Sequence, residues 1–133
     1  MIAALSGLPY FLLYFGIAVG LVALYLFVYA FVTAHNEFAL IRQNVLSAAV
    51  SLGLSLIGFA LPLSSAIVHA RNVIELIVWG VVALIVQIVV YWLVRLVVPN
   101  LSERIASGEL ASALFLGAAS LAAGVINAAS MTY

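Results

Sequence analysis

Four long apolar stretches without a charged residue dominate this sequence, at residues 10–34, 45–68, 76–94 and 110–131. Each is long enough to cross a bilayer, because a spanning helix needs about 20 apolar residues. Spanning strands are excluded, because the stretches are continuous rather than alternating and an open sheet edge cannot face lipid. The sequence therefore predicts an all-α membrane protein with four transmembrane helices.

The composition leaves no room for a second, soluble domain. Of the 133 residues, 68% are hydrophobic and 6% are charged, whereas soluble domains are about 45–50% apolar and about 25% charged. Four spans take roughly 80 positions and leave about 50 for loops and ends. We expect residues 1–133 to form a single transmembrane domain. The first ten residues lack a basic start and a cleavage pattern, so no removable signal peptide is expected.

The charge and the cysteine content exclude two further classes. The net charge is zero, so no basic patch can neutralise phosphates, and a nucleic-acid partner is excluded. The chain has no cysteine, which excludes disulfides, thiolate chemistry and cysteine-ligated metals. The lipid bilayer is the expected partner.

The two halves of the chain resemble each other. A shift of 64 residues places Asn36 on Asn100, and each half then reads as a span, an Asn-led polar loop and a second span. This predicts two repeats, at about 10–68 and about 73–131. Because each half holds two spans, the repeats would be parallel, related by an axis along the membrane normal.

The arginines give the expected orientation. Arg42 and Arg104 lie in the first and third loops, and Arg95 ends the third span on the same side, whereas Arg71 lies in the middle loop. The side richer in basic residues faces the cytoplasm. We therefore expect both termini to be periplasmic.

The spans differ in the size of their side chains. Spans one and three are rich in aromatic residues, whereas spans two and four are rich in Gly, Ala and Ser. Helices associate in lipid through close backbone approach and interhelical hydrogen bonds. Spans two and four are therefore the predicted inner pair, and spans one and three the outer layer. The expected small-residue pairs are Ala49 with Gly53 and Ala113 with Gly117.

Several strings along the whole chain resemble a known family. They are Asn36-Glu37, GFALPL at 58–63, LSERI at 101–105 and NAASMTY at 127–133. The chain is similar to the YjfL-like family of small bacterial inner-membrane proteins, domain-of-unknown-function family 350. The resemblance implies a four-helix inner-membrane protein of two repeats, without an established activity or ligand. It also implies an association with envelope-stress components of the phage-shock type and with enzymes of polyamine or glutathionylspermidine metabolism.

The first loop holds the densest cluster of ionisable residues. Glu37 could act as a general base with His35 beside it. The structural interpretation is favoured, in which Asn36 caps a short interfacial helix whose Phe38, Ile41 and Val45 face lipid. Asn100 and Glu103 would form a capping box in the third loop. The residues that would otherwise contact a ligand or partner are Asn36, Glu37, Arg42, Asn100, Glu103 and Arg104.

Polar residues recur within the spans. Gln87, Tyr91 and Arg95 share one face of span three, and polar groups at that depth often line a pathway or bond a neighbouring helix. Arg95 is close enough to the helix end to snorkel. A polar path through the membrane would consist of Ser51, Ser55, Gln87, Tyr91, Arg95 and Asn127.

Pro62 lies inside span two, where it removes the usual partner of the Gly58 carbonyl. A kink or break is expected there. Ser64 and Ser65 could satisfy the freed groups, and together with Pro62 and Asn127 they could form one polar spot.

No motif for a cofactor, a metal or catalysis is present. His69 and Glu75 are too few for a metal site, and no phosphate loop or catalytic triad occurs. We expect no metal, no cofactor and no enzymatic activity. The leading hypothesis is a self-associating or partner-binding component of envelope-stress homeostasis, expected to form a homo-oligomer. The alternatives are a small oligomeric channel or transporter for a cation or polyamine, and an interfacial enzyme that uses Glu37 and His35.

Overall fold

The computed structural model describes residues 5–33 and 37–131, and the described residues form helices without a strand. Four of the helices, of 21 to 25 residues, are long and apolar enough to cross a membrane. The prediction of an all-α protein with four transmembrane helices is confirmed. The helices are α2 (Leu8–Val32), α3 (Glu37–Arg42), α4 (Leu46–His69), α5 (Val73–Val97), α6 (Leu101–Ala106) and α7 (Leu110–Ser130).

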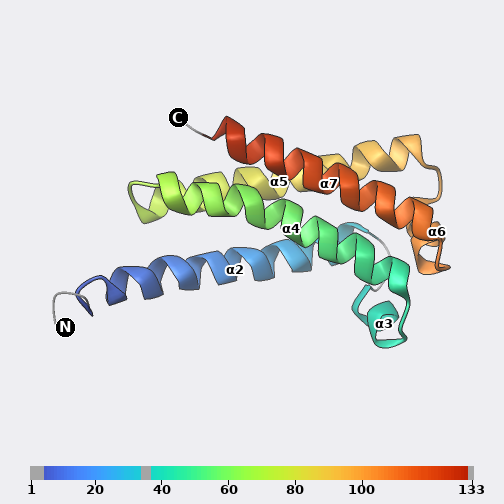
Figure 1. Ribbon diagram of the computed structural model, residues 1–133, viewed down its shortest axis with the longest axis horizontal. Helices are drawn as coiled ribbons and strands as arrows, with labels where there is room; N and C mark the ends of the chain where they lie inside the picture. The colour runs from blue at the N-terminus through green and yellow to red at the C-terminus, as the bar shows by residue number, and fades with distance from the viewer. Residues whose placement is uncertain (1–4, 34–36, 132–133) are drawn as a thin grey trace.

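The two short helices, α3 and α6, lie at one end of the bundle, and the turn between α4 and α5 lies at the opposite end. The start of α2 and the end of α7 lie at the same end as this turn (Figure 1). This matches the expectation that the first and third loops share one side. Which side faces the cytoplasm stays a prediction.

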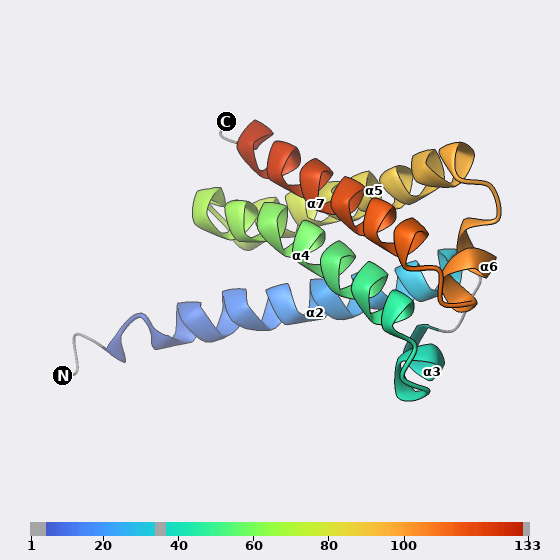
Figure 2. The ribbon, with the colours of Figure 1, turned by 45° about the vertical axis from the view of Figure 1, so that its right-hand side comes forward.

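Helix α4 occupies the centre of the bundle. It lies between α2 and α7, and α5 packs behind against both α4 and α7 (Figures 1 and 2). In the most apolar window of each helix, 50% of the residues are buried in α4, 33% in α5 and α7, and 17% in α2. The predicted pairing of spans two and four is therefore present as α4 against α7. The prediction that span three lies in an outer layer is wrong, because α5 is as enclosed as α7.

The backbones of α4 and α7 touch where two glycines meet. A Cβ atom added to Gly124 would lie 2.0 Å from the Gly58 carbonyl oxygen, and one added to Gly58 would lie 2.4 Å from the Ser120 carbonyl oxygen. Of the two expected small-residue pairs, Ala113 with Gly117 is buried on α7 against α4, whereas the prediction for Ala49 with Gly53 is wrong. Gly53 faces open space, and Gly117 accommodates the side chain of Leu54.

Helix α6 closes the bundle at the end that it shares with α3. Its Leu101 and Ile105 side chains are buried, and the Ser47 hydroxyl of α4 donates to the Ile105 carbonyl at 2.6 Å. Near α3, Phe38 is exposed as predicted. The prediction that Ile41 faces lipid is wrong, because it packs partly against the core, and Val45 does the same.

The beginning of α6 differs from the expected capping box. Asn100 has a left-handed backbone with φ of 58°, and its side chain makes no capping hydrogen bond. Its predicted counterpart Asn36 lies outside the described residues. A left-handed residue cannot present its side chain as an N-cap with extended backbone does, so the prediction for Asn100 and Glu103 is wrong.

The ends of α3 and α6 follow the same backbone path 64 residues apart. Asn44 and Gly108 both have positive φ, 64° and 93°. The next amide donates back across each turn, from Val45 to the Leu40 carbonyl and from Glu109 to the Arg104 carbonyl. The packing is less regular, since α5 contacts α4 and α7 whereas α2 packs on α4 and α5. The internal repeat stays a prediction that these local matches favour.

Candidate functional site at the crossing of three helices

Gln87 of α5 reaches the crossing of α4 and α7. Its side chain is 1% exposed, and its Nε2 donates to the Gly58 carbonyl at 3.0 Å and to the Ser120 carbonyl at 3.1 Å. The Gly58 carbonyl is the one that Pro62, four residues later, cannot serve. A side chain of a third helix therefore replaces the missing backbone donor.

Helix α4 continues through Pro62 from Leu46 to His69. Of the kink or break expected at Pro62, the break is therefore not found, and the kink stays a prediction. The expectation that Ser64 or Ser65 satisfies the freed carbonyl is wrong, because Gln87 does so. Ser64 is exposed, and the Ser65 hydroxyl instead donates to the Ala128 carbonyl of α7 at 3.1 Å.

Ser55 is the centre of a second set of buried contacts beside Gln87. Its hydroxyl lies 3.3 Å from the Ser120 hydroxyl and 3.4 Å from that of Tyr29. Its carbonyl accepts a hydrogen bond from the Tyr25 hydroxyl at 3.4 Å. The ring of Tyr25 stacks on Phe59, with the centroids 4.5 Å apart. Helices α2, α4 and α7 are thus joined through one serine.

Tyr91 extends these contacts toward α6. Its ring and the ring of Tyr29 pack in a T-shaped contact, with the centroids 6.0 Å apart. The Tyr91 hydroxyl, the Ser102 hydroxyl and the Thr33 carbonyl at the end of α2 lie within hydrogen-bond reach of one another. The two hydroxyl protons make two of these three bonds at a time. We call this set the polar network; it consists of Gln87, Ser55, Ser120, Tyr25, Tyr29, Tyr91, Ser102 and Thr33.

The predicted polar path is only partly assembled. Gln87, Ser55 and Tyr91 come together in the polar network. Ser51 instead bonds to the Ala48 carbonyl of its own helix at 3.1 Å, and Arg95 is exposed at the end of α5.

Two buried atoms in the described part of the chain lack a hydrogen-bond partner. They are the Gln87 Oε1 acceptor and the Asn127 Nδ2 donor. Asn127 lies seven residues beyond Ser120 on α7, which places both on one helical face. The proposed polar spot thus includes the unsatisfied Asn127 Nδ2 donor of α7. Ser65 of α4 bonds to the carbonyl of the next residue, Ala128.

The loop residues predicted to contact a ligand or partner do not come together in one described cluster. His35 and Asn36 lie outside the described residues, as does the side chain of Glu37. Arg42 donates from Nε to the Phe38 carbonyl of its own helix at 3.3 Å. Arg104 lies 3.8 Å from the Glu109 carboxylate. Asn100 and Glu103 line a groove with Arg95.

The whole chain can now be compared with known proteins. A family model described as Domain of Unknown Function (DUF350) matches residues 3–131. The chain belongs to this family. It is 41% identical over 129 residues to the UPF0719 inner membrane protein YjfL of Escherichia coli strain K12, covering 97% of this chain and 98% of the relative. The protein of that name in Escherichia coli O157:H7 matches equally. No solved structure matches.

Membership in the DUF350 family confirms the resemblance seen in the sequence. With the four apolar helices, it makes the chain a multi-pass protein of the bacterial inner membrane. The family description assigns no activity, so the function has to come from the structure.

One structural feature was missed in the sequence. The Asn72 Oδ1 atom accepts a hydrogen bond from the Glu75 amide at 2.9 Å and caps α5. The Arg71 guanidinium lies 3.4 Å from the Glu75 carboxylate. Asn followed by Glu three residues later, directly before an apolar run, is the signal that could have found this cap. No cluster of three metal-ligating side chains occurs within residues 5–33 and 37–131.

The polar network contains amide and hydroxyl groups but no carboxylate, imidazole or guanidinium. Its side chains bond to carbonyls and hydroxyls of neighbouring helices. Such groups hold helices together in lipid, where each bond is worth about 1–2 kcal/mol at most. The arrangement is suited to fixing the bundle rather than to proton transfer.

Proposed function

We propose that this protein is a non-catalytic inner-membrane component that acts by self-association, through a glycine face on α2 that no other helix among the described residues covers. The observation that carries the proposal is the Gly16-xxx-Gly20 pair. Both glycines are exposed, and a Cβ added to either would meet nothing within 4 Å.

The other small-residue contacts are used inside the chain. Gly58 and Gly124 bring α4 against α7, and Gly80 of α5 accommodates Leu21 of α2. Glycine in a helix interior costs about 1 kcal/mol relative to alanine. A second helix seated on Gly16 and Gly20 would give these residues the same packing role, since a G-xxx-G pair lets two spanning helices approach closely.

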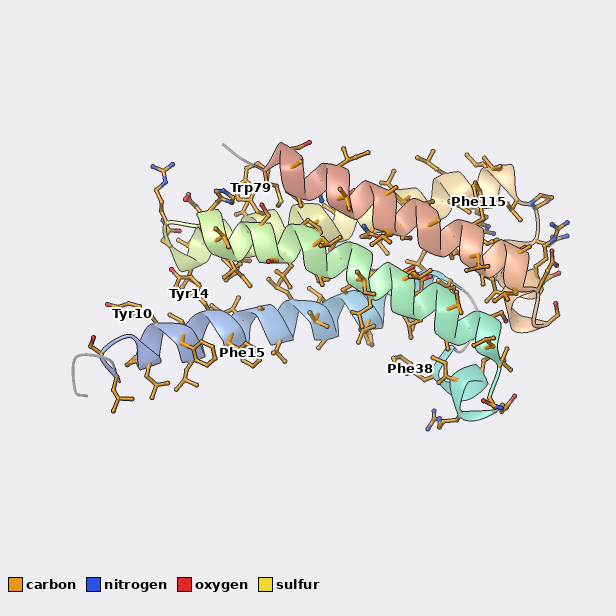
Figure 3. All side chains as sticks on the ribbon, in the orientation of Figure 1. Tyr10, Tyr14, Phe15, Phe38, Trp79 and Phe115 are labelled. Carbon is orange, nitrogen blue, oxygen red and sulfur yellow. The ribbon has the colours of Figure 1, made fainter. Side chains whose placement is uncertain are left out.

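The first half of α2 has room for such a partner. The buried residues of the whole helix are Ala18, Leu21, Tyr25 and Tyr29. None of them lies in the turns before Ala18. The start of α2 runs apart from the other helices (Figure 2), and Tyr14 and Ile17 pack only partly against the core. Phe15 projects from the side of α2 that faces away from the bundle (Figure 3), and it is 57% exposed.

The test is the oligomeric state of the purified chain in lipid nanodiscs, by native mass spectrometry or light scattering. We expect a dimer or larger assembly for the wild type. The double substitution Gly16→Leu and Gly20→Leu should shift it to monomer, because two leucines prevent close approach of the backbones.

Gly53→Leu is the matched control, because Gly53 is also in a spanning helix and also faces open space. It should leave the assembly unchanged. A wild-type monomer, or equal effects of the α2 and Gly53 variants, would refute the proposal.

The physiological role that we propose is envelope-stress homeostasis, with or without a protein partner. Deletion strains should then lose tolerance to envelope-damaging conditions. The Gly16→Leu, Gly20→Leu variant should fail to restore tolerance, whereas Gly53→Leu should restore it. Restoration by the monomeric variant would separate the cellular role from self-association.

A channel or transporter for a cation or polyamine is the second candidate. The unsatisfied Gln87 Oε1 favours it, because a buried acceptor without a partner is available to a solute. Its test is flux of cations and polyamines into proteoliposomes. Flux that Gln87→Leu abolishes, while the variant folds, would favour transport over the structural role.

An enzyme using Glu37 and His35 is the third candidate, with both side chains outside the described part. Glu37→Gln keeps size and hydrogen bonding but removes the charge. A folded variant that loses the cellular phenotype would favour chemistry or ligand contact over capping.

A further inference from the structure

A polar groove of about 230 Å³ lies where α5 passes into α6. It is lined by Arg95, Asn100, Leu101, Ser102 and Glu103. The groove has a fixed floor, because Leu101 is 1% exposed and the Ser102 hydroxyl bonds to Tyr91 and to the Thr33 carbonyl. Three segments of the chain therefore hold its shape.

The groove carries opposite charges that are not paired with each other or with other described residues. The ion pairs within residues 5–33 and 37–131 join Arg71 to Glu75 and Arg104 to Glu109. Arg95 and Glu103 are in neither pair, although both line the same groove. A groove lined by one cation and one anion matches a ligand that carries both charges itself.

The position of the groove indicates a ligand from the membrane. Helix α5 has 25 residues, which is about 37 Å at 1.5 Å per residue, longer than the hydrocarbon core of about 30 Å. Arg95 is in its last turn, at the depth of the headgroups. Beside it, Trp92, Leu93 and Leu96 are 52%, 56% and 82% exposed, an apolar surface for acyl chains.

We propose that this groove binds a phospholipid headgroup that combines a phosphate with a primary ammonium, as phosphatidylethanolamine does. The Arg95 guanidinium would donate to the phosphate oxygens, for which its planar geometry is suited. The Glu103 carboxylate would accept from the ammonium group. The inference is independent of self-association through α2.

The test is native mass spectrometry of the full chain released from bilayers containing equal amounts of phosphatidylethanolamine, phosphatidylglycerol and phosphatidylcholine with identical acyl chains. We expect phosphatidylethanolamine to be retained about two- to fivefold over the others, as for a partly exposed charge contact. Glu103→Gln should remove that preference, and Arg95→Gln should lower retention of all three lipids.

Arg42→Gln is the control, because helix α3, which ends at Arg42, lies at the same end of the protein as α6, and Arg42 is outside the groove. It should behave as the wild type. Equal retention of the three lipids by the wild type, or unchanged selectivity in Glu103→Gln, would overturn the proposal. The proposal would also be overturned if soluble phosphoethanolamine displaced bound phosphatidylethanolamine as well as the lipid itself does. The site would then recognise a free phosphate ester rather than a lipid. Circular dichroism of each variant shows that its helices are intact.

Discussion

A proline inside a helix leaves one carbonyl without its donor, and in this protein that carbonyl connects two helices. The Gln87 amide of α5 donates to the Gly58 carbonyl of α4 and also to the Ser120 carbonyl of α7. Pro62 therefore promotes helix packing, because it leaves a carbonyl free for a hydrogen bond from another helix. At the residue scale, the crossing thus depends on Gly58, Pro62 and Gln87 together.

Gln87→Leu should destabilise the bundle by about 1–2 kcal/mol, because it removes both interhelical hydrogen bonds at nearly constant volume. The free energy of unfolding in mixed micelles, followed by circular dichroism, measures the change. Ser51→Ala is the control, since the Ser51 hydroxyl donates to the Ala48 carbonyl of its own helix, and it should have a much smaller effect. Equal stability of Gln87→Leu and the wild type would contradict a bridging role.

Gly58→Ala should cost about 1–3 kcal/mol, the usual range for forced overpacking. The new methyl would lie 2.4 Å from a backbone oxygen of α7, so the two helices would have to separate. Gly53→Ala, on the same helix with open space around it, should cause no loss. The same unfolding titration compares them, and a similar loss in both would show that the contact at Gly58 is not special.

The sequence revealed part of this site. Pro62 identified the freed Gly58 carbonyl, and the depth of Gln87 marked it as a residue needing a partner. The hydrogen bond from Gln87 to the Gly58 carbonyl was not predictable, because it depends on the rotation and the register of α5 against α4. Likewise, Gly58 and Gly124 are 66 positions apart in the sequence, and nothing in either helix alone selects them over Gly53 and Gly117.

At the scale of helices, extents were well predicted and ends less so. A run of apolar residues between charged residues defines a span, so the four stretches correspond to α2, α4, α5 and α7. Ends depend on backbone conformation. Asn100 is a predicted cap but adopts positive φ, whereas Asn72, for which no cap is predicted, caps α5.

Asn72→Ala should destabilise the protein by about 1 kcal/mol, because the Glu75 amide would lose its acceptor. Thermal unfolding in micelles checks this. Asn72→Asp, which retains an acceptor oxygen, should preserve most of the stability. A loss as large in the aspartate variant would show that the cap is not the source of the effect.

At the scale of the whole molecule, the positions of the arginines predict the orientation in the membrane. Arg42, Arg95 and Arg104 are at the end of the bundle that holds α3 and α6, and Arg71 is at the opposite end. The basic end should face the cytoplasm. The chain has no cysteine, so single introduced cysteines report unambiguously.

In intact spheroplasts, a membrane-impermeant thiol reagent should label His69→Cys and not Gln43→Cys. Both positions are exposed at the ends of the bundle. Labelling of both after permeabilisation provides the control for reactivity. The reverse pattern in intact spheroplasts would place both termini in the cytoplasm.

Self-association through the Gly16 and Gly20 face is the central functional claim, and oxidative cross-linking in native membranes tests it most directly. Ala23 lies on that face, three residues beyond Gly20, and is exposed. Ala23→Cys should give disulfide-linked dimers that Gly16→Leu and Gly20→Leu suppress, whereas Val125→Cys, on exposed α7 surface, should not. Equal cross-linking at the two positions, or monomers at Ala23→Cys, would contradict the claim.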